Sequence, residues 1–387
     1  MSDILSPSNA AKAASIVYGI KYSDTSNIAI NRLNDEFGDD FHFDISTRFK
    51  GKTGLPFIST KSGFGIMGIS PDQHNKSAVI STRGTTSNPL DWLTDVNCGL
   101  SFRNSRSNKS VHSGFNHTFN SMIPEIDGFI KLHKPTTIHC VGHSLGGALA
   151  TLIAEWLAQE SSINTVNLYT FGSPRVGLEP FAQNLCSMEK VNKIFRATNA
   201  GDPVPLVPVW PFSHTPTDGS DYRVLAGFSI NPFKHKMEHY INGVGGINDW
   251  NQIKRVSNHI PSSHIDTFLN SDQGQGSFRS TLTLEKIGAA IIHLLGKAGL
   301  HGSVAIQSAL GVGFTMYDAI AWKLSDLAKK SDKMNNQVKN LMSHIAAFTG
   351  LPIKNTIAST TETIRMLFNR MIALLYYMAR NSIGRSF

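Results

Sequence analysis

One short segment decides which folds this chain can adopt: a serine flanked by glycines, placed between a strand pattern and a helix pattern. The β-branched run Thr136–Val141 leads into Gly-His-Ser-Leu-Gly at 142–146, and an Ala- and Leu-rich stretch, Leu145–Gln159, follows. A strand that enters a helix this abruptly predicts a sharp turn at Ser144. The two glycines leave room for a strained backbone and for close packing of the helix on the strand. The alternative interpretation is an ordinary glycine-rich turn.

Further helix and strand patterns alternate on both sides of this segment. Apolar spacing predicts helices at Pro7–Tyr18 and His117–Lys134, and strand-like runs lie at Lys76–Arg83, Val166–Phe171 and Lys193–Ala197. Strands that alternate with helices form mostly parallel sheets with both faces covered. We therefore expect an α/β fold with a mostly parallel central sheet.

A neutral serine is a poor nucleophile, so Ser144 needs a base, and the base needs an acid to orient it. In folds with this kind of turn the chain order is serine, acid, histidine. Asp202 fits the acid because it comes shortly after the run Lys193–Ala197 and because prolines fix its loop. Asp218 and Asp221 are the nearest rivals, but no strand pattern adjoins them. The alternative role for Asp202 is a local turn.

The base is to be chosen among the histidines that follow the acid. His235 and His239 share one face if their stretch, HKMEHYI, is helical, so only one of them is able to serve. We favour His235 because it opens this stretch after the loop 231–234, and a base has to project from such a loose end. His239 and His264 stay open as alternatives.

Acyl transfer by such a triad develops negative charge on a carbonyl oxygen, which needs two hydrogen-bond donors. One is the backbone amide of Leu145 at the start of the helix. The second is expected after an earlier strand, where Thr85 follows Arg83 and Gly84 and offers both an amide and a hydroxyl. The alternative for Thr85 is a structural turn. This chemistry requires no metal and no organic cofactor.

The composition changes near residue 275. The segment SDQGQGSFRST at 271–281 resembles a linker, and residues 281–387 show long helical patterns without strand alternation. Those last residues hold 12 Lys or Arg and 5 Asp or Glu, a net charge of +7 out of +8 for all 387 residues. We predict a catalytic domain at 1–275 and an all-helical, basic, membrane-directed C-terminal region at 276–387.

Two segments of the C-terminal region favour contact with a membrane. Ala298–Tyr317 has 20 residues and no charge, a length able to cross a bilayer, and it contains four glycines. Thr361–Arg380 carries arginines beside an apolar stripe, as interfacial helices do. The stripe comprises Ile364, Leu367, Phe368, Met371 and Leu375. The alternative is a bundle that buries these faces on itself. Nucleic-acid binding is disfavoured, since no aromatic–basic module is present.

The cysteines and the amino terminus argue against a disulfide-rich protein, a metal site and a Sec-type signal peptide. Cys98, Cys140 and Cys186 are too few for a disulfide framework, and no metal-ligand spacing stands out. The first residues lack a basic start followed by an apolar core, so no Sec-type signal peptide is expected.

Five motifs in order resemble the class 3 lipases, the fungal-type α/β-hydrolases, over roughly residues 7–249. They are STRGTT at 81–86 with a following Asp-Trp, VHSGF at 111–115, the serine turn, YTFGSPRVG at 169–177 and residues 199–205. The resemblance implies Ser144 as nucleophile and Asp202 as acid. It implies His235 as base, within the bacterial pattern His-x-Met-x-x-Tyr, and Thr85 with Leu145 as the oxyanion hole.

The chain departs from the family pattern at one point, and the resemblance also implies a lid. The separation between Asp202 and His235 is short for fungal members, which keeps His264 open as the base. In the family a mobile lid follows the oxyanion loop, here at about 87–95, and its Leu90 and Trp92 are candidates for substrate binding. His143 is a further substrate-binding candidate. The alternative for the lid is a fixed surface helix.

The C-terminal region makes the chain most similar to the secreted phospholipases A1 of enterobacteria. This similarity implies cleavage of membrane phospholipids at sn-1 and secretion without a Sec signal. Some relatives are made with a small accessory or immunity protein, which here would cover the C-terminal region. A triacylglycerol lipase is the second hypothesis, and a membrane-inserting toxin acting through its helical tail is the alternative from another class.

Overall fold

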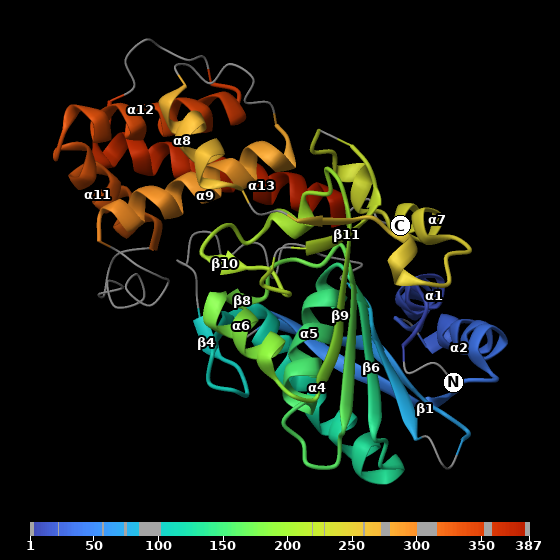
Figure 1. Cartoon of the computed structure of the whole chain (residues 1–387). Helices are drawn as coiled ribbons and strands as arrows, with labels where there is room; N and C mark the ends of the chain where they lie inside the picture. Colours follow the sequence, from blue (N-terminus) through green and yellow to red (C-terminus); the bar gives the residue numbers. More distant parts are fainter. Residues whose placement is uncertain are drawn as a thin grey trace.

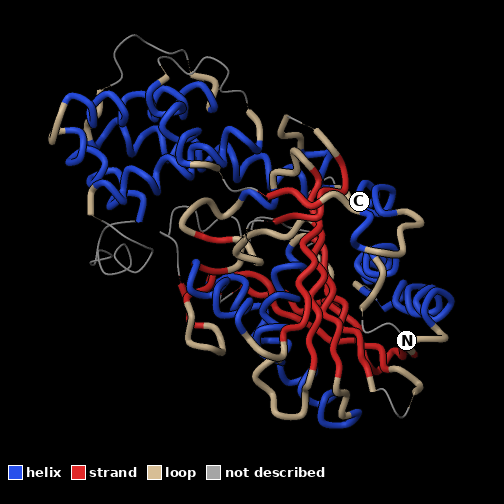
Figure 2. The backbone as a smooth tube through the Cα atoms, viewed as in Figure 1, coloured by secondary structure: helices blue, strands red, loops and turns tan. Residues whose placement is uncertain are grey.

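A twisted sheet forms the centre of the larger part of the molecule (Figures 1 and 2). The computed structural model describes residues 4–21, 23–55, 58–72, 76–84, 102–218, 220–227, 229–257, 260–271, 279–299, 316–351 and 358–383. Within these ranges the sheet has eight strands, in the order β1-β2-β3-β6-β7-β9-β11-β12. They are β1 (His42–Leu55), β2 (Ile58–Ile69), β3 (Ser77–Thr82), β6 (Thr137–His143), β7 (Thr165–Phe171), β9 (Val191–Asn199), β11 (Ser220–Leu225) and β12 (Arg255–Ser257).

The middle of the sheet is parallel and its edges are antiparallel. Strands β3, β6, β7, β9 and β11 pair in parallel, whereas β1, β2 and β12 pair antiparallel with their neighbours. The predicted α/β-hydrolase class with a mostly parallel sheet is therefore confirmed, and β3, β6, β7 and β9 match the four predicted strands. A small second sheet consists of β10 (Phe212–Ser213), β8 (Gly177–Leu178), β5 (Ser110–His112) and β4 (Phe102–Asn104).

Helices cover both faces of the main sheet (Figure 1). On one face lie α4 (Ser113–His133) and α5 (Leu145–Leu157), and on the other lie α1 (Pro7–Ile16), α2 (Ser23–Phe37) and α7 (Met237–Val244). Successive side chains of a strand point to opposite faces. On β6, Cys140 accordingly packs into the cluster under α5, and Val141 into the cluster under α1. Short elements complete this part: η1 (Val17–Ile20), α6 (Glu179–Ser187), η3 (Val204–Leu206), η4 (Pro232–His235) and η5 (Trp250–Gln252).

The C-terminal region is a helical bundle at one end of the sheet, seen in orange and red in Figure 1. Its described helices are α8 (Ser262–Asn270), α9 (Thr281–Lys297), α11 (Met316–Ala328), α12 (Asp332–Phe348) and α13 (Thr361–Ile383). Helix α8 packs against α9 and α12: Asn340 Nδ2 donates to the carbonyl of Leu269 at 2.9 Å. Helix α8, which precedes the boundary predicted near residue 275, thus packs together with helices that follow that boundary.

The apolar stripe of α13 is covered. Leu375 has no exposed surface, and Ile364, Leu367, Phe368 and Met371 belong to the same buried cluster as α9, α11 and α12. The stripe is thus buried against the other helices of the bundle and does not face a membrane, contrary to the favoured prediction. Among the described residues no helix has the length and apolar content to cross a bilayer. Most of the uncharged run Ala298–Tyr317 lies outside the described residues.

Helix α13 also reaches the catalytic domain. It packs against η3, which follows Asp202, and against η4, which ends at His235. One continuous apolar cluster contains residues of α4, α5, η3 and the bundle helices. The bundle is therefore built onto the hydrolase fold rather than tethered to it.

The burial of α13 yields a stability prediction. Leu375→Ala should lower the free energy of unfolding by about 2–5 kcal/mol, because it leaves a cavity in a closed core. Tyr377→Ala, two residues on and 64% exposed, should change it by less than about 0.5 kcal/mol. Urea unfolding of both variants measures the difference. Equal, small effects would contradict the packing of the stripe.

Candidate active site

The turn at Ser144 links β6 to α5 and sets the position of the candidate nucleophile. Ser144 has a φ of +58°, in the left-handed region that side chains rarely adopt. A Cβ at Gly142 would lie 2.2 Å from the carbonyl oxygen of Gly146, and one at Gly146 would lie 2.2 Å from that of Thr82. Both contacts are with backbone atoms that have little room to move. Glycine is therefore required at both positions.

The structure brings the three predicted triad residues together. Nε2 of His235 lies 2.8 Å from Oγ of Ser144, and Nδ1 of His235 lies 2.8 Å from Oδ2 of Asp202. Asp202 follows the carboxyl end of β9, and His235 is the last residue of η4. All three side chains are buried. The distances allow a proton to pass from the serine to an imidazole that a carboxylate orients.

Asp202 has further partners that fix its carboxylate. Oδ2 accepts a hydrogen bond from the hydroxyl of Tyr240 at 2.7 Å, and Oδ1 accepts one from the amide of Val204 at 2.9 Å. Burial, together with the charge of Asp202, raises the pKa of Tyr240 well above its usual range, so the hydroxyl stays a donor. Gly172 closes this cluster with a φ of +56°, and a Cβ there would lie 2.8 Å from Oδ2 of Asp202. The hydrogen bonds from Tyr240 and Val204 thus prevent the carboxylate from turning away from His235.

His143 supports the imidazole of His235 from one side. The two rings stack with centroids 4.6 Å apart, and Nε2 of His143 donates to the backbone carbonyl of His235 at 2.9 Å. Its Nδ1 then accepts from the hydroxyl of Tyr18 at 2.7 Å. Burial, and then the charge of His235, hold the pKa of His143 well below its usual range. Both ring nitrogens have protein partners, which suits a positioning residue more than the substrate contact expected from the sequence.

The rival residues have other environments. Asp221 is buried between Arg196 and Arg223, with which it forms ion pairs. Asp218 is exposed and pairs with Arg255 at 3.3 Å. The rival His239 lies on α7, beyond His235, and the rival His264 is exposed on α8 of the bundle. Among the described residues, His235 is the histidine that lies between Ser144 and Asp202.

The oxyanion hole is described in part. Leu145 is the first residue of α5, where backbone amides have no partner within the helix. Gly84 adjoins the nucleophile: a Cβ on it would lie 3.0 Å from Cβ of Ser144. The predicted donor Thr85, the lid at 87–95 with Leu90 and Trp92, and Cys98 lie outside the described residues. Within the described ranges, no three His, Cys, Asp or Glu residues cluster as metal ligands.

Comparisons with known proteins agree with this geometry. The family model described as lipase (class 3) matches residues 79–212, which include the serine turn and Asp202. The chain is 34% identical over 164 residues to the secreted mono- and diacylglycerol lipase 1 of Fusarium solani, covering 41% of this chain and 47% of that protein. Residues 79–212 of this chain therefore match the class 3 lipase family.

Other relatives differ in name and extent. The chain is 27% identical over 225 residues to phospholipase A1-II 1 of Oryza sativa, covering 50% of this chain and 54% of the relative. It is 35% identical over 101 residues to toxin TseL of Vibrio cholerae, covering 26% of this chain and 15% of that protein. The structure of a lipase from Rhizopus microsporus var. chinensis matches with a TM-score of 0.40 and 22% identity, covering 52% of this chain and 68% of that one. The chain spans about half the length of the first two curated relatives.

Two residues of the site would have been hard to find from local sequence. Tyr240 is visible only as the last letter of the pattern His-x-Met-x-x-Tyr, and its bond to Asp202 requires the folded chain. Gly172 stands in YTFGSPRVG, where a glycine directly after a strand signals a positive φ or a close approach. Both are positioning residues for the carboxylate.

The buried histidines of β6 predict how stability depends on pH. Burial lowers the pKa of His139 to about 4, whereas an unfolded histidine has a pKa near 6.5. Below pH ~6.5 the histidine is protonated in the unfolded chain but stays neutral in the folded chain. The free energy of unfolding therefore falls between pH ~6.5 and ~4, by about 1.4 kcal/mol per pH unit for each such histidine. Urea unfolding across this range should show a shallower slope for His139→Asn. An unchanged slope would mean that folded His139 accepts the proton.

Proposed function

We propose that this protein is a serine hydrolase that cleaves carboxylic ester bonds of membrane phospholipids at sn-1, a phospholipase A1. The observation that carries the hydrolase part is the chain of two 2.8 Å contacts from Ser144 through His235 to Asp202. The phospholipid part rests on the similarity to phospholipase A1-II 1 of rice.

The proposed reaction has two halves. His235 removes the proton of Ser144 as Oγ attacks the ester carbonyl, and the oxyanion receives hydrogen bonds from the amide of Leu145 and from Thr85. His235 then returns the proton to the departing lysophospholipid oxygen, which leaves an acyl-enzyme. Water, deprotonated by His235, hydrolyses the acyl-enzyme and releases the fatty acid. Asp202 stays ionised and stabilises the imidazolium throughout.

A membrane is the proposed partner, reached through a different surface from the one the sequence favoured. The exposed side of α13 carries Arg365, Arg370 and Arg380 with Met366 and Tyr377. Basic residues near an anionic surface each contribute about 1 kcal/mol, and an interfacial tyrosine adds apolar contact. Secretion and an accessory or immunity protein over the C-terminal region belong to the same proposal.

A triacylglycerol lipase is the second candidate, favoured by the 41% identity over 91 residues to triacylglycerol lipase OBL1 of Ricinus communis. Purified protein should hydrolyse phosphatidylcholine vesicles faster than emulsified trioctanoin. The reverse order would select the lipase. A membrane-inserting toxin that acts through its tail would keep lysing vesicles after Ser144→Ala, and the proposed enzyme would not.

The nucleophile prediction is direct. Ser144→Ala should lower ester hydrolysis by about 10⁴-fold or more with an unchanged unfolding midpoint, because removal of the triad serine acts on the chemical step. A chromogenic short-chain ester gives the rate. Retention of more than about a tenth of the wild-type activity would overturn the mechanism.

The two helix-adjacent histidines provide a matched pair. His235→Ala should be as inactive as Ser144→Ala, since triad members act as a unit, whereas His239→Ala should keep most of its activity. The turnover number of each variant on the same soluble ester measures this. If His239→Ala were the inactive variant, the assignment of the base would be wrong.

A further inference from the structure

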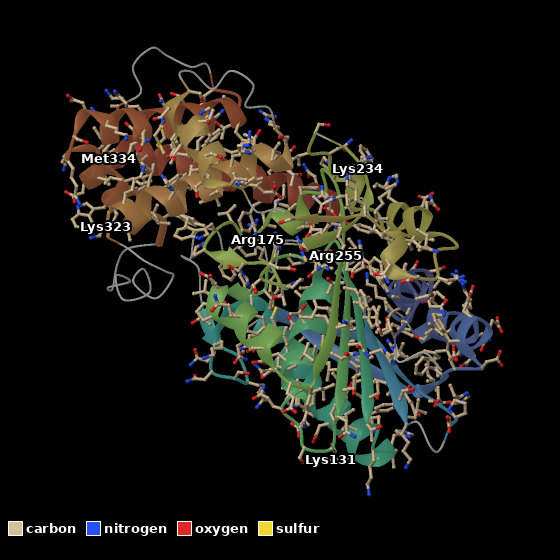
Figure 3. All side chains as sticks on the ribbon, in the orientation of Figure 1. Lys131, Arg175, Lys234, Arg255, Lys323 and Met334 are labelled. Carbon is tan, nitrogen blue, oxygen red and sulfur yellow. The ribbon has the colours of Figure 1, made fainter. Side chains whose placement is uncertain are left out.

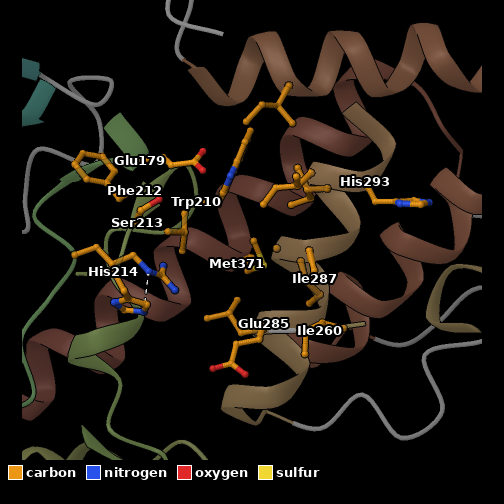
Figure 4. Close-up of a pocket in the computed structure, with 18 of the residues that line it drawn as sticks. Glu179, Trp210, Phe212, Ser213, His214, Ile260, Glu285, Ile287, His293 and Met371 are labelled. Atoms are coloured by element: carbon orange, nitrogen blue, oxygen red, sulfur yellow. Dashed lines mark hydrogen bonds between the residues drawn. The ribbon is translucent and has the colours of Figure 1, made fainter. Parts of the chain in front are cut away.

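A cavity of about 510 Å³ lies where the catalytic domain meets the bundle, apart from the triad. Its walls come from the loops and short strand β10 around residues 175–217 on one side and from α9, α11 and α13 on the other (Figure 4). No triad residue lines it. Its volume lies within the range of about 300–1,000 Å³ typical of small-molecule sites, which suits one chain of a lipid rather than two.

Most of the wall is apolar. The side chains that give it this character are Trp210, Phe212, Ile287, Ile291, Phe368 and Met371. On α9 the wall also includes Gly288, where an added Cβ would meet no atom within 4 Å. An aliphatic chain placed here would bury its surface against these groups at about 25 cal/mol per Å².

One end of the cavity presents an arginine with donor capacity left over. Nε of Arg175 donates to Nε2 of His214 at 3.1 Å, and Nη1 donates to the carbonyls of Leu206 and Pro208. Within the described part of the chain, Nη2 has no hydrogen-bond partner. Arg175 lies at the junction of the two regions in Figure 3. A phosphate oxygen is the ligand that such a guanidinium edge prefers.

His214 does not neutralise this charge. Its Nε2 also lies 3.1 Å from Nη2 of Arg196, so one nitrogen accepts from two arginines. Burial and then these two cations hold the pKa of His214 well below its usual range. The imidazole is therefore neutral, and Arg175 keeps its full positive charge at the cavity wall.

Carboxylates stand on other parts of the same wall. Glu285, on α9, is half-buried and has no hydrogen-bond partner among the described residues. Burial raises its pKa despite the nearby arginines. Glu179 lines the cavity from the start of α6 and is exposed. Figure 4 shows Glu285 and His214 on elements that face one another. The cavity thus combines a cation and anions with an apolar interior.

We propose that this cavity binds a single-chain lipid with a zwitterionic head, whose phosphate pairs with Arg175 and whose ammonium pairs with Glu285. The chain would lie against Ile287 and Met371. Glu285 already lies near Arg175, Arg196 and Arg223. A zwitterionic head is the one whose two charges match both the guanidinium edge of Arg175 and the carboxylate of Glu285. The site is separate from the proposed hydrolysis, and its occupation does not depend on Ser144.

The cavity itself is tested by filling it. Isothermal titration of the full chain with dodecylphosphocholine, below its critical micelle concentration, should give saturable binding of one molecule. Gly288→Leu should weaken that binding at least tenfold, because the new side chain occupies the cavity, whereas the matched control Gly288→Ala should bind like the wild type. Neither variant should have a lower unfolding midpoint, since both remove a helix glycine. No saturable wild-type binding, or equal binding by Gly288→Leu, would overturn the proposal.

The head group is tested with three probes that share one C12 chain: dodecylphosphocholine, dodecanoate and dodecyltrimethylammonium. The zwitterionic probe should bind most tightly, and Glu285→Gln should weaken it while strengthening dodecanoate. Wild-type preference for dodecanoate would show an anion site instead, and equal binding of all three would show an apolar site only. Ser144→Ala should bind the zwitterionic probe like the wild type, so failure here is distinguishable from failure of the proposed hydrolysis.

Discussion

The backbone of Ser144 imposes the constraint on which the site depends. A non-glycine residue at φ +58° costs of the order of 1–3 kcal/mol and persists only where its surroundings leave no alternative. Here the amide of Ser144 donates to the carbonyl of Phe171, and its own carbonyl accepts from the amide of Gly147. The turn therefore holds the hydroxyl at the carboxyl edge of the sheet, where the loops after β9 and β11 bring Asp202 and His235 to it.

The support of the base comes from three separate parts of the chain. His143 stacks on its ring from the end of β6, Asp202 holds Nδ1 from the loop after β9, and α13 packs against η4 from the bundle. Tyr18, near the amino terminus, fixes His143 in turn. A short loop such as η4 has little cohesion of its own, so its geometry depends on these distant elements. The bundle is thus part of the structure that positions the triad.

Local features made much of the site predictable from the sequence. The strand, glycines and helix around Ser144 lie within one continuous stretch, and Asp202 directly follows a strand pattern with prolines behind it. The choice of His235 over His239 needed tertiary information, because both stand on one short segment. The strands β1 and β2 gave no clear pattern, since β1 is rich in polar residues and its pairing contains register shifts.

The bundle was predicted less well, for a physical reason. An amphipathic helix shows the same apolar period whether lipid or other helices cover its stripe, since both remove it from water. The stripe through Leu367 and Leu375 therefore gave no means of choosing between membrane and bundle. Similarly, a Gly-, Ser- and Gln-rich segment indicates a connection without telling whether it joins two domains or two helices that pack together, as α8 and α9 do.

The contact between α13 and η4 has a consequence for the order of events during synthesis. Domains generally begin to fold from the amino-terminal side while the ribosome is still adding residues. The serine turn and Asp202 emerge early, but the helix that packs on the loop of His235 is translated last among the described elements. The contact that fixes the loop of His235 therefore forms only after translation has passed the residues of α13, later than the residues of the serine turn are made.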